Sequence, residues 1–358
     1  MNAVWRDRLS QDALKRLALG LAVGTAGGAV AWSLDVPLAW MLGALFACMF
    51  ASIAGLPVAV PLWLRANFMV LIGLFLGESF DGLTMAELAR WPVSILGAIL
   101  YVPVAGWLAY LFFRHVAKED RVTAVCSGIP GGLTALVLIA GGMGADERHV
   151  ALAQSLRIAI VVCLAPVIAF GYLGLTPPTP ELFAERQLIG VADFVLLLVA
   201  AILATLALQW LRLPIPFLLG PILASAVLRI AGVVEGVLPH ILVEVALVVT
   251  GSSIGTRFHG VAMTDWLRFA AYTFGGTLVL MAVSVVFAQA ISALTGIDYF
   301  VALLAYAPGG IAEMSLIALA IDADPAFVAL HHVVRITFIL LAVPAFGVWL
   351  RRQVQDNP

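Results

Sequence analysis

Two arginines and one glutamate are the residues best suited to chemistry in an otherwise strongly apolar chain. Arg157 and Arg335 each lie well inside an apolar run, and Glu313 lies inside another. Burying a guanidinium at such depth costs about 2.5 to 3.5 kcal/mol, so each arginine needs a polar partner. Gln154 and His332 each precede an arginine by three residues and so share its helix face. Ionisable groups placed in this way usually mark the path of a polar solute.

Two Pro-Gly-Gly motifs interrupt apolar runs that should otherwise be regular membrane helices. Pro130 and Pro308 begin them, and Glu313 follows the second motif by three residues, where Ala135 stands after the first. Proline removes a backbone donor, so helices should end here and leave backbone groups facing something polar. We therefore expect substrate-binding residues at Pro130, Gly131, Gly132, Thr134, Arg157, Pro308, Gly309, Gly310, Glu313, His332 and Arg335.

Each of these groups also has a purely structural interpretation. Arg157 and Arg335 could bind only the carbonyls that the broken runs set free, or a carboxylate such as Glu313. Glu313 could be the site of a coupling proton or cation, because one carboxylate can be neutralised by either. A plain buried pair of Glu313 with Arg335 is the alternative.

The composition argues against a metal enzyme. His331 and His332 are adjacent and point about 100° apart on a helix, which suits joint metal ligation poorly. Cys48, Cys126 and Cys163 fall in apolar runs without CxxC spacing and are expected to pack. We predict no metal site, no cofactor and no enzymatic activity.

The elements that must position these residues are membrane helices. Of the 358 residues, 63% are hydrophobic and 11% charged, and the mean hydropathy is +1.08. Apolar runs of about 17 to 25 residues have the length that crosses a bilayer, so we predict an all-α polytopic protein with about 10 to 12 segments. The runs span 17–34, 38–55, 62–80, 92–113, 122–143, 149–173, 188–211, 214–233, 240–256, 268–293, 299–320 and 327–350.

The two halves of the chain correspond as tandem repeats offset by about 178 residues. Gly, Pro and Arg positions match in register, and Gly73 and Gly77 match Gly251 and Gly255. These glycines are expected to let helices pack closely. We predict repeats at 1–175 and 188–350, joined by a proline-rich linker at 176–187.

Loop charges favour inverted repeats. If the Pro-Gly-Gly run of each half enters and leaves on one side, five crossings per half remain, and more Lys and Arg then fall on one side than with six crossings. Both termini should then be cytoplasmic, in an inner membrane. Inverted repeats with interrupted helices near the midplane are the build of many secondary transporters.

The paired motifs, each followed by an aspartate and then a segment with an embedded arginine, resemble the integral-membrane AbrB family over about residues 14 to 350. Members carry tandem AbrB duplication domains and are often labelled ammonia monooxygenases or regulators of gene expression. The resemblance implies kinship with cation/proton antiporters and anion transporters. It supplies no substrate.

We therefore expect a secondary transporter for a small solute, an organic or inorganic anion, coupled to a proton or cation. A membrane-embedded regulator or sensor of gene expression and a transporter of a small cation or amine such as ammonium stay open. A monooxygenase would need a copper or iron site that the sequence does not supply. The partners expected are the solute and the lipid bilayer but no nucleic acid, and a homodimer is left open.

Single cysteines test the inverted topology. A cysteine at Thr179 should react with a membrane-impermeant thiol reagent from outside, and one at Lys118 from inside. Labelling of both from inside would favour parallel repeats.

Overall fold

The computed structural model is helical throughout the residues that it describes, apart from one isolated bridge between Leu188 and Val237. These residues are 10–36, 38–80, 89, 91–131, 136, 140–168, 187–211, 213, 215–258, 263–321 and 323–355. The predicted all-α class is confirmed. The linker 176–186, Gly132 and Thr134 lie outside the described residues.

Helices occupy the segments expected from hydropathy, but the helix that begins the run 122–143 ends at Gly128, and the run 299–320 is divided between two short helices. Within the described ranges, eight are long and apolar enough to cross a membrane, and α3 and α12 are shorter apolar helices. The chain is thus a helical integral membrane protein. In order, the elements are α2 (Gln11–Ser33), α3 (Ala39–Ile53), α4 (Leu62–Gly77), η1 (Glu78–Phe80), α6 (Trp91–His115), α7 (Arg121–Gly128), α9 (Glu147–Pro166), α11 (Val191–Trp210), α12 (Pro216–Ile230), α13 (His240–Gly255), η3 (Thr256–Phe258), α14 (Met263–Thr295), α15 (Tyr299–Tyr306), α16 (Ile311–Ala320) and α17 (Pro325–Gln355).

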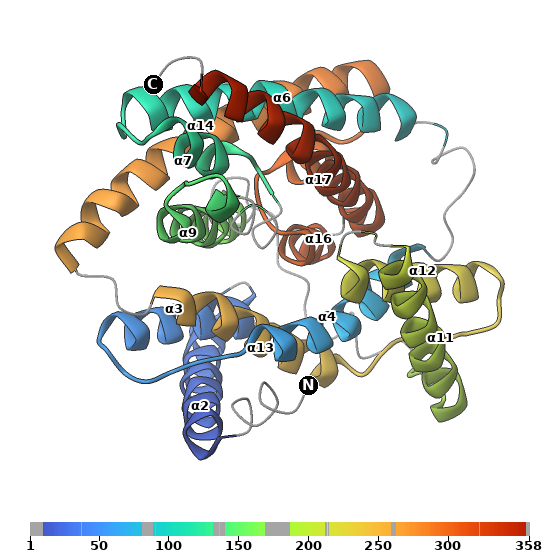
Figure 1. Cartoon of the computed structure of the whole chain (residues 1–358). Helices are drawn as coiled ribbons and strands as arrows, with labels where there is room; N and C mark the ends of the chain where they lie inside the picture. Colours follow the sequence, from blue (N-terminus) through green and yellow to red (C-terminus); the bar gives the residue numbers. More distant parts are fainter. Residues whose placement is uncertain are drawn as a thin grey trace. The chain divides into compact units, whose positions relative to one another are not determined.

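The chain forms two compact units, and each combines helices from both halves of the sequence (Figure 1). Unit 1 consists of Met1–Glu78, Pro177–Leu208 and Ile215–Trp266, and unit 2 of Ser79–Thr176, Gln209–Pro214 and Leu267–Pro358. The predicted repeats at 1–175 and 188–350 stay a prediction. The two compact units do not coincide with these halves, because helices of each half pack with helices of the other.

Glycines bring the helices of unit 1 into close contact. A Cβ at Gly73 or Gly77 of α4 would collide with α12, and one at Gly251 or Gly255 of α13 would collide with the backbone of α3. The predicted close packing at these glycines is confirmed. The two contacts are reciprocal, since a helix of each half packs on a helix of the other.

A buried ion pair joins three segments of unit 1. The Glu78 carboxylate, just beyond α4, accepts from Arg229 Nη2 of α12 at 3.2 Å and from the Leu238 amide at 2.8 Å. Arg229 also donates to the Gly236 carbonyl at 2.8 Å. The side chains of Arg229 and Glu78 are 3% and 10% exposed. The pair therefore ties the end of α4 to α12 and to the turn that follows α12.

Unit 2 is built around the two interrupted runs. The α7 helix packs on α6 and α9, while α15 and α16 pack on α17, and α16 also contacts α9. The fully buried Tyr101 of α6 lies edge-on to Phe287 of α14 and Tyr306 of α15. The helices that carry the predicted site residues thus belong to one compact unit.

Removing one partner of the Glu78–Arg229 pair should destabilise the protein strongly. Arg229→Ala leaves a buried carboxylate without its countercharge, and such losses cost about 3 to 5 kcal/mol. We expect a large fall in the midpoint of thermal unfolding in detergent. Lys15→Ala, at an exposed position of α2, is the control and should leave the midpoint unchanged. Equal midpoints for the two variants would contradict the structural role of the pair.

Candidate functional site

Both Pro-Gly-Gly motifs end a helix, as predicted. The α7 helix stops at Gly128, and Ile129 is extended with φ −66° and ψ 125°. The α15 helix stops at Tyr306, and Ala307 is extended with φ −54° and ψ 140°. A new helix, α16, starts directly after Gly310. Carbonyls at the ends of α7 and α15 are thereby released from helical bonding and need donors from elsewhere.

The first break obtains its donors from α9. Gln154 Nε2 donates to the carbonyls of Cys126 at 2.8 Å and Ile129 at 3.1 Å. Arg157 Nη1 donates to the same Ile129 carbonyl at 2.9 Å, and its Nη2 donates to Gln154 Oε1 at 2.7 Å. Arg157 is only 3% exposed. The predicted sharing of a helix face by these two side chains is confirmed, and together they cap the end of α7.

The second break is capped by α17 in the same way. His332 Nε2 lies 2.9 Å from the Leu304 carbonyl, and Arg335 Nη1 donates to the Ala307 carbonyl, at 2.6 Å. Arg335 Nη2 donates to the Gly309 carbonyl at 3.1 Å and lies 3.0 Å from His332 Nδ1. Both side chains are essentially inaccessible to solvent. The cation sits at a helix C-terminus, where the helix dipole favours positive charge.

The two arginines differ at one atom. Arg157 Nε donates to the Pro308 carbonyl at 3.1 Å, so α9 holds the second break as well as the first. The Nε of Arg335 is buried and has no hydrogen-bond partner among the described residues. Pro130 is the position in the first half that corresponds to Pro308. Its carbonyl accepts no hydrogen bond from Arg335 Nε. Arg335 therefore keeps one buried donor whose counterpart in Arg157 is used.

Glu313 lies in the first turn of α16 and is 2% exposed. Gly310 is the residue that precedes this helix, with φ −83° and ψ 156°. A Cβ on Gly310 would collide with the Glu313 carboxylate, so the carboxylate lies over the start of its own helix. A glutamate at this third helical position often caps the helix N-terminus. The position explains why glycine is needed at 310 although its backbone angles suit any residue.

The structure thus brings most of the predicted site residues into unit 2. Pro130, Gly131, Pro308, Gly309 and Gly310 form the two breaks. Arg157 and Arg335 donate to carbonyls of the second break, and His332 lies beside the Leu304 carbonyl of α15. These contacts match the structural interpretation of the arginines, in which they bind freed carbonyls. Gly132 and Thr134 lie outside the described residues.

A buried polar network beside the second break escaped sequence analysis. Tyr306 donates its hydroxyl to the Ser94 carbonyl, and Ser94 Oγ lies 2.9 Å from His331 Nε2. Ser284 donates to the Tyr306 carbonyl at 3.0 Å and lies 3.1 Å from the Tyr101 hydroxyl. No spacing in the sequence links α6, α14, α15 and α17. Only His331, beside His332, carried a local signal.

The fold and site define an integral membrane protein in which two interrupted helices are held by buried arginines. Residues 40–351 match the model of a family described as "Transition state regulatory protein AbrB", and the chain belongs to that family.

Two relatives extend over nearly the whole chain. One is "Uncharacterized protein YhjN" of Bacillus subtilis (strain 168), which is 29% identical over 91% of this chain and 91% of its own length. The other is "Putative regulator AbrB" of Escherichia coli (strain K12), which is 27% identical over 88% of this chain and 90% of its own.

The contact between Gly310 and Glu313 can be tested by a double-mutant cycle. Gly310→Ala should displace the carboxylate and lower the thermal midpoint in the wild-type background. In a protein that already carries Glu313→Ala, the same substitution should change the midpoint little. Residues in contact typically couple by about 0.5 to 3 kcal/mol. Additive effects of the two substitutions would show that the carboxylate does not lie over Gly310.

Proposed function

We propose that this protein is a secondary membrane transporter for a small anion, organic or inorganic. The observation that carries the proposal is the buried Nε of Arg335, a cationic donor left open beside an interrupted helix. A buried charged donor without a partner is costly, and a carboxylate, phosphate or similar oxyanion would satisfy it. The anion would bind at this atom of Arg335.

The charge balance supports an anion over a cation. Arg157 and Arg335 contribute two positive charges, and Glu313 contributes one negative charge when it is ionised. The α15 carbonyls offset part of the charge of Arg335, since helix C-termini carry partial negative charge. A positive excess remains at the two breaks. Protonation of Glu313, or a cation bound there, would change this excess and so couple ion and solute.

The correspondence between the halves supports the repeats, whose inverted orientation rests on the loop charges. Gln154 contacts Cys126 as His332 contacts Leu304, and each pair of positions differs by 178. Aspartates also begin corresponding helices: Asp120 and Asp298 cap α7 and α15 through their carboxylates. In this proposal both termini are cytoplasmic, and the membrane is the inner one.

Two other functions compete with this one. The word "regulator" in the name of the Escherichia coli relative favours a membrane-embedded sensor, in which ligand binding would occur without flux. Transport of ammonium or another small amine would instead make Glu313 the binding group. Binding and flux assays with the same compounds separate these three functions.

Substitutions at Arg335 test the anion site. Purified protein should be thermally stabilised by at least one of a panel of carboxylates, phosphate and sulfate, and ammonium should have no effect. Arg335→Lys keeps the charge but lacks the Nε donor, so stabilisation by the anion should fall by about tenfold in apparent affinity, equivalent to about 1.4 kcal/mol. Unchanged affinity would contradict the proposal, as would stabilisation by ammonium alone.

Glu313→Gln tests the coupling. The glutamine amide has the size of the glutamate side chain but cannot take up a proton or bind a cation as the carboxylate can. We expect anion binding to persist and to lose its dependence on pH or on added cation, measured by the same thermal assay. If Arg157→Ala and Arg335→Ala only misfold and no ligand restores their thermal stability, the arginines are structural and the assignment of the anion site is wrong.

A further inference from the structure

His331 lies in the second turn of α17 and places both of its ring nitrogens against polar atoms of unit 2. The side chain is fully buried. Nδ1 lies 2.7 Å from the Phe327 carbonyl, one turn earlier in the same helix, and Nε2 lies 2.9 Å from Ser94 Oγ of α6. A carbonyl oxygen can only accept a hydrogen bond, so Nδ1 must carry a proton. The protonation state of His331 therefore depends on which atom holds the proton between Nε2 and Ser94 Oγ.

The Ser94 hydroxyl has one proton and two acceptors within reach. Its Oγ lies 2.8 Å from the Trp91 carbonyl as well as 2.9 Å from His331 Nε2. When His331 is neutral, one of these two contacts lacks a proton. When Nε2 also carries a proton, it donates to Ser94 Oγ, and the hydroxyl is free to donate to the Trp91 carbonyl. The imidazolium form of His331 is therefore the one that turns every one of these contacts into a hydrogen bond.

The aromatic ring of Phe327 favours a positive charge at the same place. The ring centroids of Phe327 and His331 lie 3.9 Å apart, with 35° between the ring planes. A cation over the face of an aromatic ring is attracted by its negative charge density, and the attraction is stronger away from water. Trp91 meets Phe327 edge-on with the centroids 5.7 Å apart, which helps to fix the ring beneath the imidazole.

The neighbouring His332 has the opposite arrangement. Its Nε2 faces the Leu304 carbonyl and must donate to it, whereas its Nδ1 faces Arg335 Nη2. A guanidinium can only donate, so Nδ1 of His332 must be unprotonated. His332 is thus held in one neutral form, while His331 has an acceptor for a proton on each ring nitrogen.

Charged and titratable groups surround His331 on α17 and on the helices α6, α15 and α16 that pack against it. They are Tyr101 of α6, Tyr306 of α15, Glu313 of α16, and His332 and Arg335 of α17. Burial and the positive charge of Arg335, one turn further along the helix, oppose a second proton on His331. The negative charge of an ionised Glu313 acts in the other direction. The three hydrogen bonds and the contact with Phe327 are what favour the proton.

We propose that His331 is a proton-binding site, at which a second proton on the imidazole is held by Ser94 Oγ and turns the Ser94 hydroxyl towards Trp91. Binding of the proton requires the rotation of one hydroxyl and no movement of heavier atoms. The Ser94 carbonyl accepts from the hydroxyl of Tyr306, the last residue of α15, so the site adjoins the second break. A proton here would offset the charge of an anion bound at Arg335, and only this coupling rests on the proposed function.

Nuclear magnetic resonance of the full-length protein in detergent, with nitrogen-15 in its histidines, reports the protonation of each ring nitrogen without any transported solute. The chain has six histidines, and the signals of His331 are those that are missing from His331→Gln. We expect both nitrogens of His331 to be protonated at about pH 5 and only one at about pH 8, the range in which histidine changes charge. His332 should keep one unprotonated nitrogen throughout.

Ser94→Ala removes the oxygen that receives the second proton. The pH at which His331 is half protonated should fall by about one unit, a tenfold loss of proton affinity, because hydrogen bonds from charged donors are the stronger ones. Ser284→Ala is the matched control. Its hydroxyl belongs to the same buried network but contacts Tyr101 and Tyr306 rather than His331, so the midpoint should stay unchanged.

Two results would overturn the proposal: an unprotonated nitrogen on His331 at pH 5 in the folded protein, or equal midpoints in Ser94→Ala and Ser284→Ala. If Ser94→Ala does not fold, Phe327→Leu removes the ring beneath the imidazole and should lower the midpoint in the same direction. A failed anion screen would refute the proposed transport and leave the proton site standing. A failed titration would remove the proton site and leave the anion site to its own assay.

Discussion

The structure of unit 2 depends on one requirement, that backbone carbonyls released inside an apolar region must find donors. Two helices stop at Gly128 and Tyr306, and the bilayer offers no water to bind what they expose. Long guanidinium side chains meet this need because each carries five donors in a planar fork. The choice of arginine over lysine follows, since one ammonium could not reach carbonyls in two separate segments with defined geometry. Gln154 and His332 complete the caps and orient the arginines.

A structural role for these arginines does not compete with a functional one. A bilayer penalises buried charge, so a cation that survives there must be nearly fully satisfied. Arg335 falls one donor short of this, because its buried Nε has no hydrogen-bond partner among the described residues. The same atom of Arg157 is occupied by the Pro308 carbonyl. The two side chains, at corresponding positions of the two halves, thus differ in the donors that they leave free, and the proposed anion site depends on this difference.

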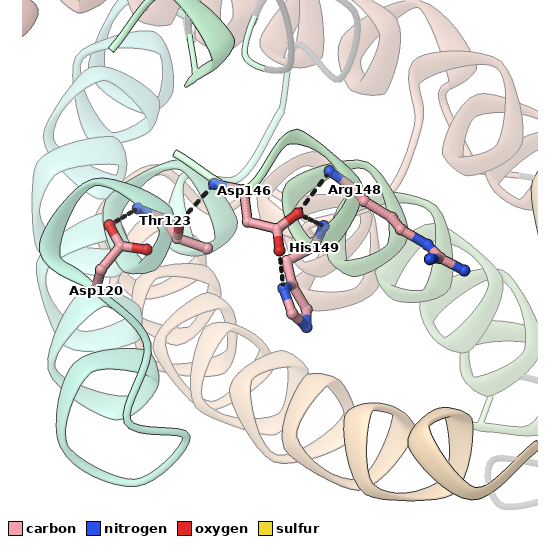
Figure 2. Close-up of polar contacts among 5 residues, drawn as sticks. All are labelled: Asp120, Thr123, Asp146, Arg148 and His149. Atoms are coloured by element: carbon pink, nitrogen blue, oxygen red, sulfur yellow. Dashed lines mark hydrogen bonds and ion pairs between the residues drawn. The ribbon is translucent and has the colours of Figure 1, made fainter. Parts of the chain in front are cut away.

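The N-termini of α7 and α9 are capped by polar side chains, as in water-soluble proteins. Asp120 and Asp146 cap helices with side-chain oxygens, and Thr123 accepts from the Asp146 amide, so α7 and α9 are joined at their starts (Figure 2). Both ends of the short helix α7 are therefore held by polar contacts, one set at its N-terminus and one deeper at its break. With only eight residues, α7 has little internal stability, and these contacts determine its position.

The sequence alone determined the helical class, the positions of the membrane segments and the two breaks, because hydropathy, proline and helical spacing act over a few residues. It also determined that Gln154 and His332 would assist the arginines, since both lie three residues away on the same helix. Tertiary structure decided everything that joins distant segments: the bond from Arg157 to the Pro308 carbonyl, the pairing of Arg229 with Glu78, the polar network around Tyr306 and the mixing of both halves in each unit. Residues that meet across about 150 positions leave no periodic trace in the chain. Their pairing follows from which helices pack together, which local pattern cannot encode.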